Sequence, residues 1–438
     1  FFEPLRKAVD NLKIRLSYGS LGNQQIGYYD FIQTITTKGS MSDYSFDGTV
    51  LGQHATVSDP VSGDQTWEKV VSKNLGLDLN MFNNRLSLTT DFYIRDTKGI
   101  LGKGKSLPSI YGASEPQMNA NNLRTKGYEL VLGWRDSFKL AGSTFSYGIT
   151  GTFSDYTAEY TKCDNPTGLI GDPYVGKKYG EIWGYKVDGL FRNDKEAAEY
   201  ASRIDLSTVA SGYYTATGAY GKGVRGGDIK YLDLNGDNIV NGGKGTLDDP
   251  GDRRVIGNSS PRYQYGASLN FSWYGFDVSV FMQGIGRLDW YPGADNLRFW
   301  GPYCRPYATF VPKNFMSQVW SEENPDAYFP RARAYTSLNS NSGTAYYTND
   351  RYLQNLAYCR VKNITVGYTI PAVWTKKVKI ERLHIYFSGE NLFTFSPLKS
   401  DYIDPEQASA ENSIQSANGN AKLYPWSKTY SFGVNVTF

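Results

Sequence analysis

Three groups of residues in this sequence have types and spacings that could support chemistry. The first is GILGKGKS at residues 99–106, which satisfies the GxxxxGKS/T pattern of a phosphate-binding loop. Phosphate binding needs a buried strand before the loop and a helix after it, because amide groups at the helix start hold the phosphate oxygens. Pro108, Gly112 and Pro116 follow, without helical periodicity. We therefore interpret this match as a solvated loop that binds no nucleotide.

The second group lies in DLNGDNIVN, where Asp233, Asn235 and Asp237 stand at alternate positions. Calcium-binding loops place oxygen ligands at this spacing and end on a bidentate glutamate. Here the last position is Lys244, so Asp248 or the aspartate after it would have to supply the missing carboxylate. Two interpretations stay open: a structural Ca²⁺ or Mg²⁺ that stiffens the loop, or an Asx-rich turn without an ion.

The third group consists of aromatic and basic residues in long connecting segments. Trp300, Tyr303 and Arg305 occur in RFWGPYCRPYATF, and Trp426 lies near the end of the chain. Aromatic faces stack on sugar rings, and Tyr and Arg also suit peptides, so these four residues are candidates for ligand contact. The alternative, which we favour for each residue, is that the rings pack the connections against one another or against a capping protein.

The remaining composition gives little support for catalysis. The 438 residues include only two histidines, and the three cysteines lie far apart with no CxxC pair. Neither GxSxG nor HExxH occurs, so no nucleophile elbow or zinc-protease site is predicted. The net charge of +3 gives no bias towards nucleic acid. We therefore expect a protein that is not an enzyme and has no nucleic-acid partner.

The elements that must position these residues are strands with two different faces. In residues 126–134, for example, Tyr128, Leu130, Leu132 and Trp134 alternate with polar or small residues, which is the period of a strand. Ten segments show this alternation: 12–19, 73–82, 85–96, 126–134, 144–154, 261–273, 275–284, 360–370, 382–395 and 430–438.

The connections between these segments alternate between short and long, as in an outer-membrane β-barrel with short periplasmic turns and long extracellular loops. Asn83-Asn84 and Tyr274-Gly275 are short connections, whereas the segments after Tyr18 and Ser154 are long. Aromatic residues at the ends of the apolar rows are typical of the rings that lie at the membrane interfaces. A soluble β-sandwich or propeller is the alternative, but the faces opposite the apolar rows are small and polar rather than charged.

Several longer stretches closely resemble the carboxy-terminal half of SusC/RagA-type TonB-dependent transporters of Bacteroidota outer membranes. They are LKIRLSYGSLGNQQIG at 12–27, WEKVVSKNLGLDLNMFNNRLSLTTDFYIRDTKGIL at 67–101, NLRTKGYELVLGW at 122–134, GEIWGYKVDGLF at 180–191, GDIKYLDLNGDNIVN at 227–241, DRRVIGNSSPRYQYGASLNFSWYGFDVSVFMQGIGRLDW at 252–290, CRVKNITVGYTIP at 359–371, YFSGENLFTFSPL at 386–398, DPE at 404–406 and YPWSKTYSFGVNVTF at 424–438.

The resemblance implies an all-β fold: about ten carboxy-terminal strands of a 22-stranded transmembrane barrel that holds a plug. Residues 1–438 would be one barrel portion, and the plug and TonB box would lie outside this chain. The implied function is TonB-dependent import of oligosaccharides or oligopeptides across the outer membrane. The implied partners are a SusD-like lipoprotein, TonB, outer-membrane lipid and the rest of the same barrel. The alternatives are a passive porin or a surface-binding barrel without energy coupling, and a soluble β-rich adhesin.

The final strand carries a further expectation. In YSFGVNVTF the apolar row ends on Phe438 at the carboxyl terminus. A last strand that ends on an aromatic residue is the signal that the assembly machinery of outer-membrane barrels reads, and Phe438 matches that pattern. The apolar row would then face lipid, and the polar row would face the lumen. The alternative is a last strand that simply packs well.

Overall fold

The chain is described by a computed structural model. The described residues are 8–23, 32–38, 54–63, 65–103, 109–215, 223–293, 296–304, 311–333, 346–400, 402–408 and 425–438.

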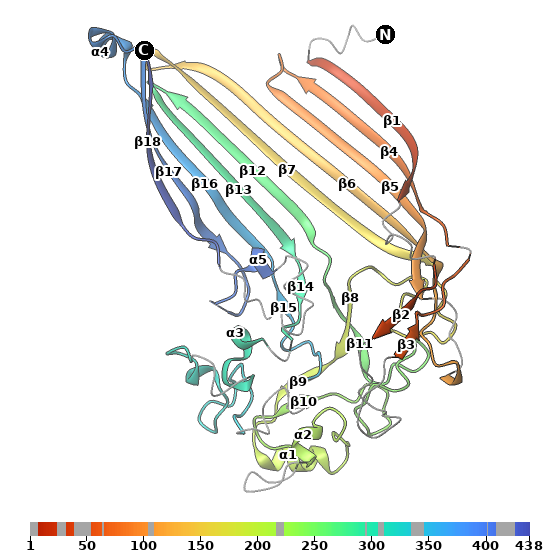
Figure 1. Cartoon of the computed structure of the whole chain (residues 1–438). Helices are drawn as coiled ribbons and strands as arrows, with labels where there is room; N and C mark the ends of the chain where they lie inside the picture. Colours follow the sequence, from red (N-terminus) through yellow and green to blue (C-terminus); the bar gives the residue numbers. More distant parts are fainter. Residues whose placement is uncertain are drawn as a thin grey trace.

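Ten strands form one antiparallel sheet, in which every strand pairs with the neighbours that precede and follow it among the ten (Figure 1). This confirms the ten alternating segments predicted from the sequence. In sheet order, the strands are β1 Val9–Asn23, β4 Glu68–Met81, β5 Leu86–Lys103, β6 Gln117–Leu140, β7 Ser143–Lys162, β12 Arg262–Trp273, β13 Phe276–Arg287, β16 Tyr358–Thr369, β17 Arg382–Phe395 and β18 Thr429–Thr437.

The register of the sheet places the apolar side chains on one face and the polar side chains on the other. Leu75 of β4 lies opposite Leu16 of β1 and Phe92 of β5, and Phe92 lies opposite Tyr128 of β6. Leu16 remains 79% exposed, although full burial of a leucine side chain would contribute about 1.5–3 kcal/mol. Such a continuous exposed apolar face requires a covering, and in an outer-membrane barrel that covering is lipid.

Short turns and long connections lie at opposite ends of the sheet (Figure 1). At the short-turn end, Ala141-Gly142 and Tyr274-Gly275 have positive φ at both positions (47° and 84°, 49° and 81°). These angles match the two-residue turns whose twist suits a tight β-hairpin. The turn between β16 and β17 instead contains α4, Ala372–Thr375.

The long connections fold into a layer of their own at the other end of the sheet. This loop layer contains short two-stranded sheets and short helices. Its elements are β2 Ile35–Lys38, β3 His54–Val57, β8 Glu181–Tyr185, β9 Val187–Leu190, α1 Asp194–Ala201, α2 Ser211–Thr215, β10 Ile229–Tyr231, β11 Arg253–Asn258, β14 Asp289–Trp290, α3 Leu297–Trp300, β15 Gln354–Asn355 and α5 Pro405–Ala408.

The buried hydrophobic core lies in the loop layer and not on the large sheet. Phe191, Leu206, Trp300, Tyr352 and Leu356 are fully buried in one cluster contributed by several connections. The described parts of the connections that contribute to this cluster are therefore packed together and not separate loops. Within the described ranges, none of the helices has both the length and the apolar character that crossing a membrane would require.

Candidate functional site

The polar face of the sheet carries a network of charged side chains near its first strands. Arg15 on β1 contacts Asp78 on β4 through Nε (2.9 Å) and Asp91 on β5 through Nη2 (2.8 Å). Asn74 donates a further hydrogen bond to Asp91, at 2.7 Å. Because the partners are on three adjacent strands and are partly buried, the network fixes the strands and leaves a polar wall. None of the side chains in this network is a nucleophile, and the network contains no acid and base that face a cavity together.

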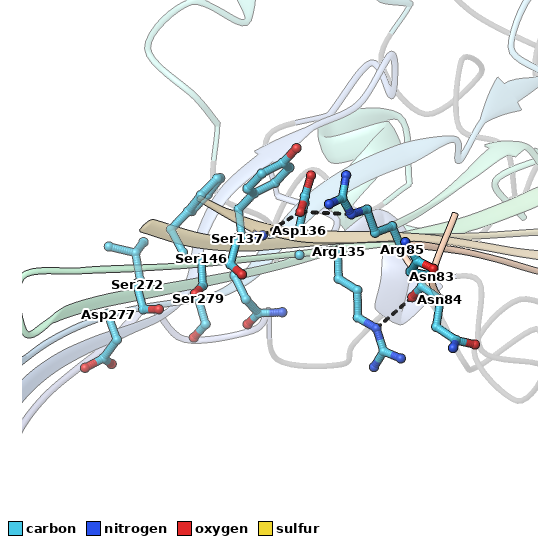
Figure 2. Close-up of a pocket in the computed structure, with 15 residues that line it drawn as sticks. Asn83, Asn84, Arg85, Arg135, Asp136, Ser137, Ser146, Ser272, Asp277 and Ser279 are labelled. Carbon is cyan, nitrogen blue, oxygen red and sulfur yellow. Dashed lines mark hydrogen bonds and ion pairs between the residues drawn. The ribbon is translucent and has the colours of Figure 1, made fainter. Parts of the chain in front are cut away.

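A hollow of about 670 Å³ lies on the same face, near the short turns. Arg135, Asp277 and Ser279 extend from the strands on one side of the sheet, and Arg85 pairs with Asp136 on the other side (Figure 2). Arg135 donates to the backbone oxygen of Asn84 at 3.0 Å. The remaining polar groups of this hollow can hydrogen-bond to water or to another polar protein surface.

A buried ion cluster ties the last long connection to the polar face of the sheet. Arg360 on β16 is 2% exposed and contacts Asp404 at 2.7 Å and Glu406 at 2.5 Å. Lys362 also contacts Glu406, at 3.0 Å, and Asp404 Oδ1 accepts a hydrogen bond from the backbone N–H of Glu406 at the start of α5. Segment 402–408 is therefore held against the inner wall of the sheet at the loop end.

The structure places two of the predicted ligand-contact residues inside the loop core. Trp300 is fully buried and donates from Nε1 to the Gly293 oxygen at 3.0 Å. Tyr303 is 3% exposed and stacks on Phe329. Neither ring presents a face to a ligand, so the alternative of loop packing applies to both residues. A pattern of aromatic residues in a connection could not distinguish these two roles, because the core of this protein lies in its connections.

The other two predicted ligand-contact residues have different outcomes. Arg305 lies outside the described residues. Trp426 is 48% exposed, and the Lys362 ammonium lies 4.7 Å from the centre of its ring. This exposed ring beside the Arg360 cluster stays a prediction for ligand contact.

The stretch DLNGDNIVN forms a tight turn held by its own side chains. Asp233 accepts hydrogen bonds from the backbone N–H groups of Gly236 (2.7 Å) and Asn238 (2.9 Å). Asp237 accepts one from Ile239, and Asn235 donates to Asp237. Each oxygen-bearing side chain thus already has a protein partner, as expected for an Asx-rich turn.

The predicted fourth ligand of this turn is not gathered with the others. Asp248 is exposed, and the described residues contain no group of three or more His, Cys, Asp or Glu that could hold a metal. Asp252 joins the turn instead: it is fully buried and accepts from the N–H groups of Leu234 (2.7 Å) and Asn241 (2.9 Å). Its position gave no signal in the sequence, because it lies far along the chain from the residues it contacts. Metal binding at this turn stays a prediction.

The loop layer also contains a buried ion pair. Arg333 contacts Asp228 at 2.6 Å, with both side chains buried. Burial raises the pKa of the Asp228 carboxyl to about 6, against the opposing attraction of Arg333.

The structure describes only part of the segment that matches the phosphate-loop pattern. Gly99–Lys103 belongs to strand β5, and residues 104–108 lie outside the described residues. The described residues that follow begin with a single 3-10 turn, Ser109–Tyr111, and not with the longer helix that a phosphate-binding loop needs.

Comparison with known proteins extends this picture. No model of a known protein family matches the chain. The chain is 25% identical, over 97% of its length, to TonB-dependent receptor P3 of Formosa agariphila, and 22% identical, over 98%, to TonB-dependent receptor SusC of Bacteroides thetaiotaomicron. Structures of the RagAB peptide transporter and of the RagAB peptide importer in its "closed-closed" state superpose on 99% and 98% of the chain, with TM-scores of 0.63 and 0.64 and 20% identity in each.

Along nearly its whole length, the chain is similar in sequence to TonB-dependent receptors, SusC among them, and it has the fold of the matching part of the RagAB transporter. It spans about 40% of the length of the relatives it matches: 39% of receptor P3, 38% of SusC and 41% of the RagAB chain. Receptors of this kind are β-barrels of the outer membrane and are not enzymes, which agrees with the two-faced sheet. Among the described residues, the ten-stranded sheet does not close into a barrel.

Proposed function

We propose that this receptor chain is the carboxy-terminal barrel portion of an importer that moves oligosaccharides or oligopeptides across the outer membrane. TonB would supply the energy through a plug and a TonB box elsewhere in the full protein. A SusD-like lipoprotein would cover the loop end and deliver the substrate. The porin without energy coupling is the competing function.

The observation that carries the proposal is the combination of an exposed apolar face with a continuous polar one. The Arg15 network and the hollow near Arg135 form an inward surface suited to contact with a plug or with a hydrated substrate. The loop layer has its own buried core, so it can present a stable surface to a partner. The match to the RagAB peptide importer supports peptides as one of the two substrate classes.

The strand edges support the remaining barrel as a partner. In the described sheet, β1 and β18 each have only one hydrogen-bonded neighbour. An unpaired strand edge in lipid leaves backbone N–H and C=O groups without partners, at a cost of several kcal/mol each. We therefore propose that both edges pair with further strands of the same protein.

The test is uptake by the native organism. The gene would be deleted and restored, and uptake of labelled oligosaccharides and labelled oligopeptides would be measured with and without TonB. We expect one substrate class to enter only in the strain that has both the gene and TonB. Uptake that needs the gene but continues without TonB would establish the passive porin and contradict the proposal. Uptake that is unchanged by the deletion would contradict both functions.

A further inference from the structure

A groove of about 620 Å³ crosses the apolar, outward face of the sheet towards its loop end. One wall is formed by a row of residues on adjacent strands that includes Leu16, Leu75, Phe92 and Tyr128. The opposite wall, one step nearer the loops, contains Lys73, Ile94 and Lys126. The groove therefore changes from apolar to cationic in the direction of the extracellular end.

The two lysines of this groove lie close to each other. Lys73 on β4 and Lys126 on β6 both lie opposite Ile94 on β5. Neighbouring strands are about 4.8 Å apart, so the two Cα atoms are separated by roughly 10 Å. Both side chains are exposed, and within the described residues neither forms an ion pair.

A second pair of lysines continues this cationic strip. Lys69 on β4 and Lys98 on β5 lie directly opposite each other on the same outward face. Like charges at directly opposed positions of a sheet are unfavourable, and among the described residues neither lysine has a carboxylate in contact. The strip from Lys73 to Lys69 extends over roughly 13 Å, at about 3.3 Å per residue.

Of the carboxylates on this face, two have arginine partners, and Glu159 on β7 lies directly opposite Arg124. Asp96 accepts from Arg124 at 2.7 Å, and Asp155 accepts from Arg262 through two hydrogen bonds of 2.6 Å. The outward strip thus carries four lysines and Arg124 against the carboxylates of Asp96 and Glu159.

We propose that this strip and groove form a binding site for a phosphate-bearing lipopolysaccharide of the outer leaflet. The phosphates of its lipid A headgroup would lie between Lys73 and Lys126, with Lys69 and Lys98 above them. An acyl chain would cover Leu75, Phe92 and Tyr128. Ammonium groups bind phosphate oxygens by charge-assisted hydrogen bonds, and the apolar groove removes acyl surface from water. The site rests on the outer-membrane location and on the proposed orientation of the loops towards the outside.

The test uses the full-length receptor purified from its own outer membrane in mild detergent. The double variant Lys73→Gln/Lys126→Gln would be compared with the wild type and with Lys376→Gln/Lys377→Gln. The control removes the same charge from exposed residues in the turn at the opposite, periplasmic end. Retained lipopolysaccharide would be counted by mass spectrometry, and affinity would be measured with purified lipopolysaccharide and with the same material after removal of its phosphates.

We expect the groove variant to bind lipopolysaccharide about 25-fold more weakly, since each lysine near an anionic headgroup contributes about fivefold. The control should bind as the wild type does, and dephosphorylated lipopolysaccharide should not distinguish the three proteins. Equal binding by the groove variant and the wild type would overturn the proposal. So would equal binding of phosphatidylethanolamine and lipopolysaccharide by the wild type.

Assembly of each variant would be checked by its heat-dependent mobility in gel electrophoresis, which reports a folded barrel. A groove variant that is folded and imports substrate but loses lipopolysaccharide supports the site. A wild-type protein absent from the outer membrane would contradict the localisation and the proposed function instead. The two failures can therefore be told apart.

Discussion

Arg360 organises the polar groups at the loop end of the sheet. Its guanidinium has two carboxylate partners and also donates from Nε to Thr394 at 2.8 Å. A buried ion pair is a weak source of net stability, but removing one partner is costly, because the other charge remains buried and alone. Arg360 therefore determines whether segment 402–408 stays against the wall of the barrel.

We predict that Arg360→Met releases segment 402–408, at a cost of about 3–5 kcal/mol in the free energy of unfolding. Hydrogen exchange of the segment's amides in the full-length protein would measure this. The exposed residue Lys399 provides the control, and Lys399→Met should leave exchange unchanged. If segment 402–408 kept its protection in Arg360→Met, the ion cluster would not be what holds it.

Asp252 has a comparable role in the DLNGDNIVN turn. Asp252→Ala would leave the N–H groups of Leu234 and Asn241 without the buried carboxylate that accepts from both, and we expect a loss of about 3 kcal/mol in local stability. The control Asp237→Ala removes an exposed carboxylate and should cost about 1 kcal/mol or less. Thermal unfolding and proteolysis of the loop layer would measure the difference. Equal losses for the two variants would contradict this assignment.

The site residues show which roles a sequence can reveal. The motif DPE at 404–406 was recognisable, but its partner Arg360 could not be predicted, because ion pairs between distant segments depend on the register of the strands. Trp300 and Tyr303 were identifiable as aromatic residues of a connection, and only the structure showed that they are buried. Nothing in the sequence pointed to the role of Asp252, because a single aspartate forms no recognisable pattern with the residues that it contacts.

At the scale of single elements, each strand is defined by the difference between its two faces. Strand β12 shows this clearly: Tyr263 and Trp273 lie at the two ends of its outward row, and Leu269 lies between them. Ser268 is its neighbour on the inward face, opposite Thr150 of β7. Aromatic ends with an apolar middle are expected of a strand that crosses lipid.

We predict that Leu269→Arg destabilises the assembled barrel by about 2–4 kcal/mol, because a charge would be placed at mid-depth in lipid. Ser268→Arg introduces the same side chain on the polar face and should have a much smaller effect. Urea unfolding of the full-length receptor in lipid vesicles would compare the two. A larger effect of Ser268→Arg would reverse the assignment of the two faces.

The final strand carries a separate prediction. Phe438 follows β18, extends its outward row and is 84% exposed, and its role as an assembly signal stays a prediction. We expect Phe438→Ala to lower strongly the amount of folded receptor in the outer membrane, whereas Thr437→Ala, on the inward row, should not. Quantitative blotting of outer-membrane fractions would test this. Normal assembly of Phe438→Ala would leave Phe438 as an ordinary packing residue.

The strands of the large sheet were predictable because alternation is a local property of the sequence, and short turns such as Asn83-Asn84 have their own local signals. The loop layer was not predictable in the same way. Its strands are short, as in β14 and β15 with two residues each, and its core joins segments separated by long stretches of chain. Neither feature produces a periodic pattern.

The whole molecule is a curved, two-faced sheet with a packed layer at one end (Figure 1). The edges at β1 and β18, the polar inner wall and the loop layer each call for a different partner. These partners would be further barrel strands, a plug and a capping lipoprotein. The account of an energised importer depends on all three being present in one complex.

The most direct measurement is mass spectrometry of the complex purified in detergent from the native outer membrane, with every polypeptide and every retained ligand identified. We predict one receptor polypeptide that continues beyond this chain into a plug and a TonB box, together with a SusD-like lipoprotein and a retained oligosaccharide or oligopeptide. Recovery of this chain alone, or recovery in the soluble fraction, would contradict the account of an outer-membrane importer.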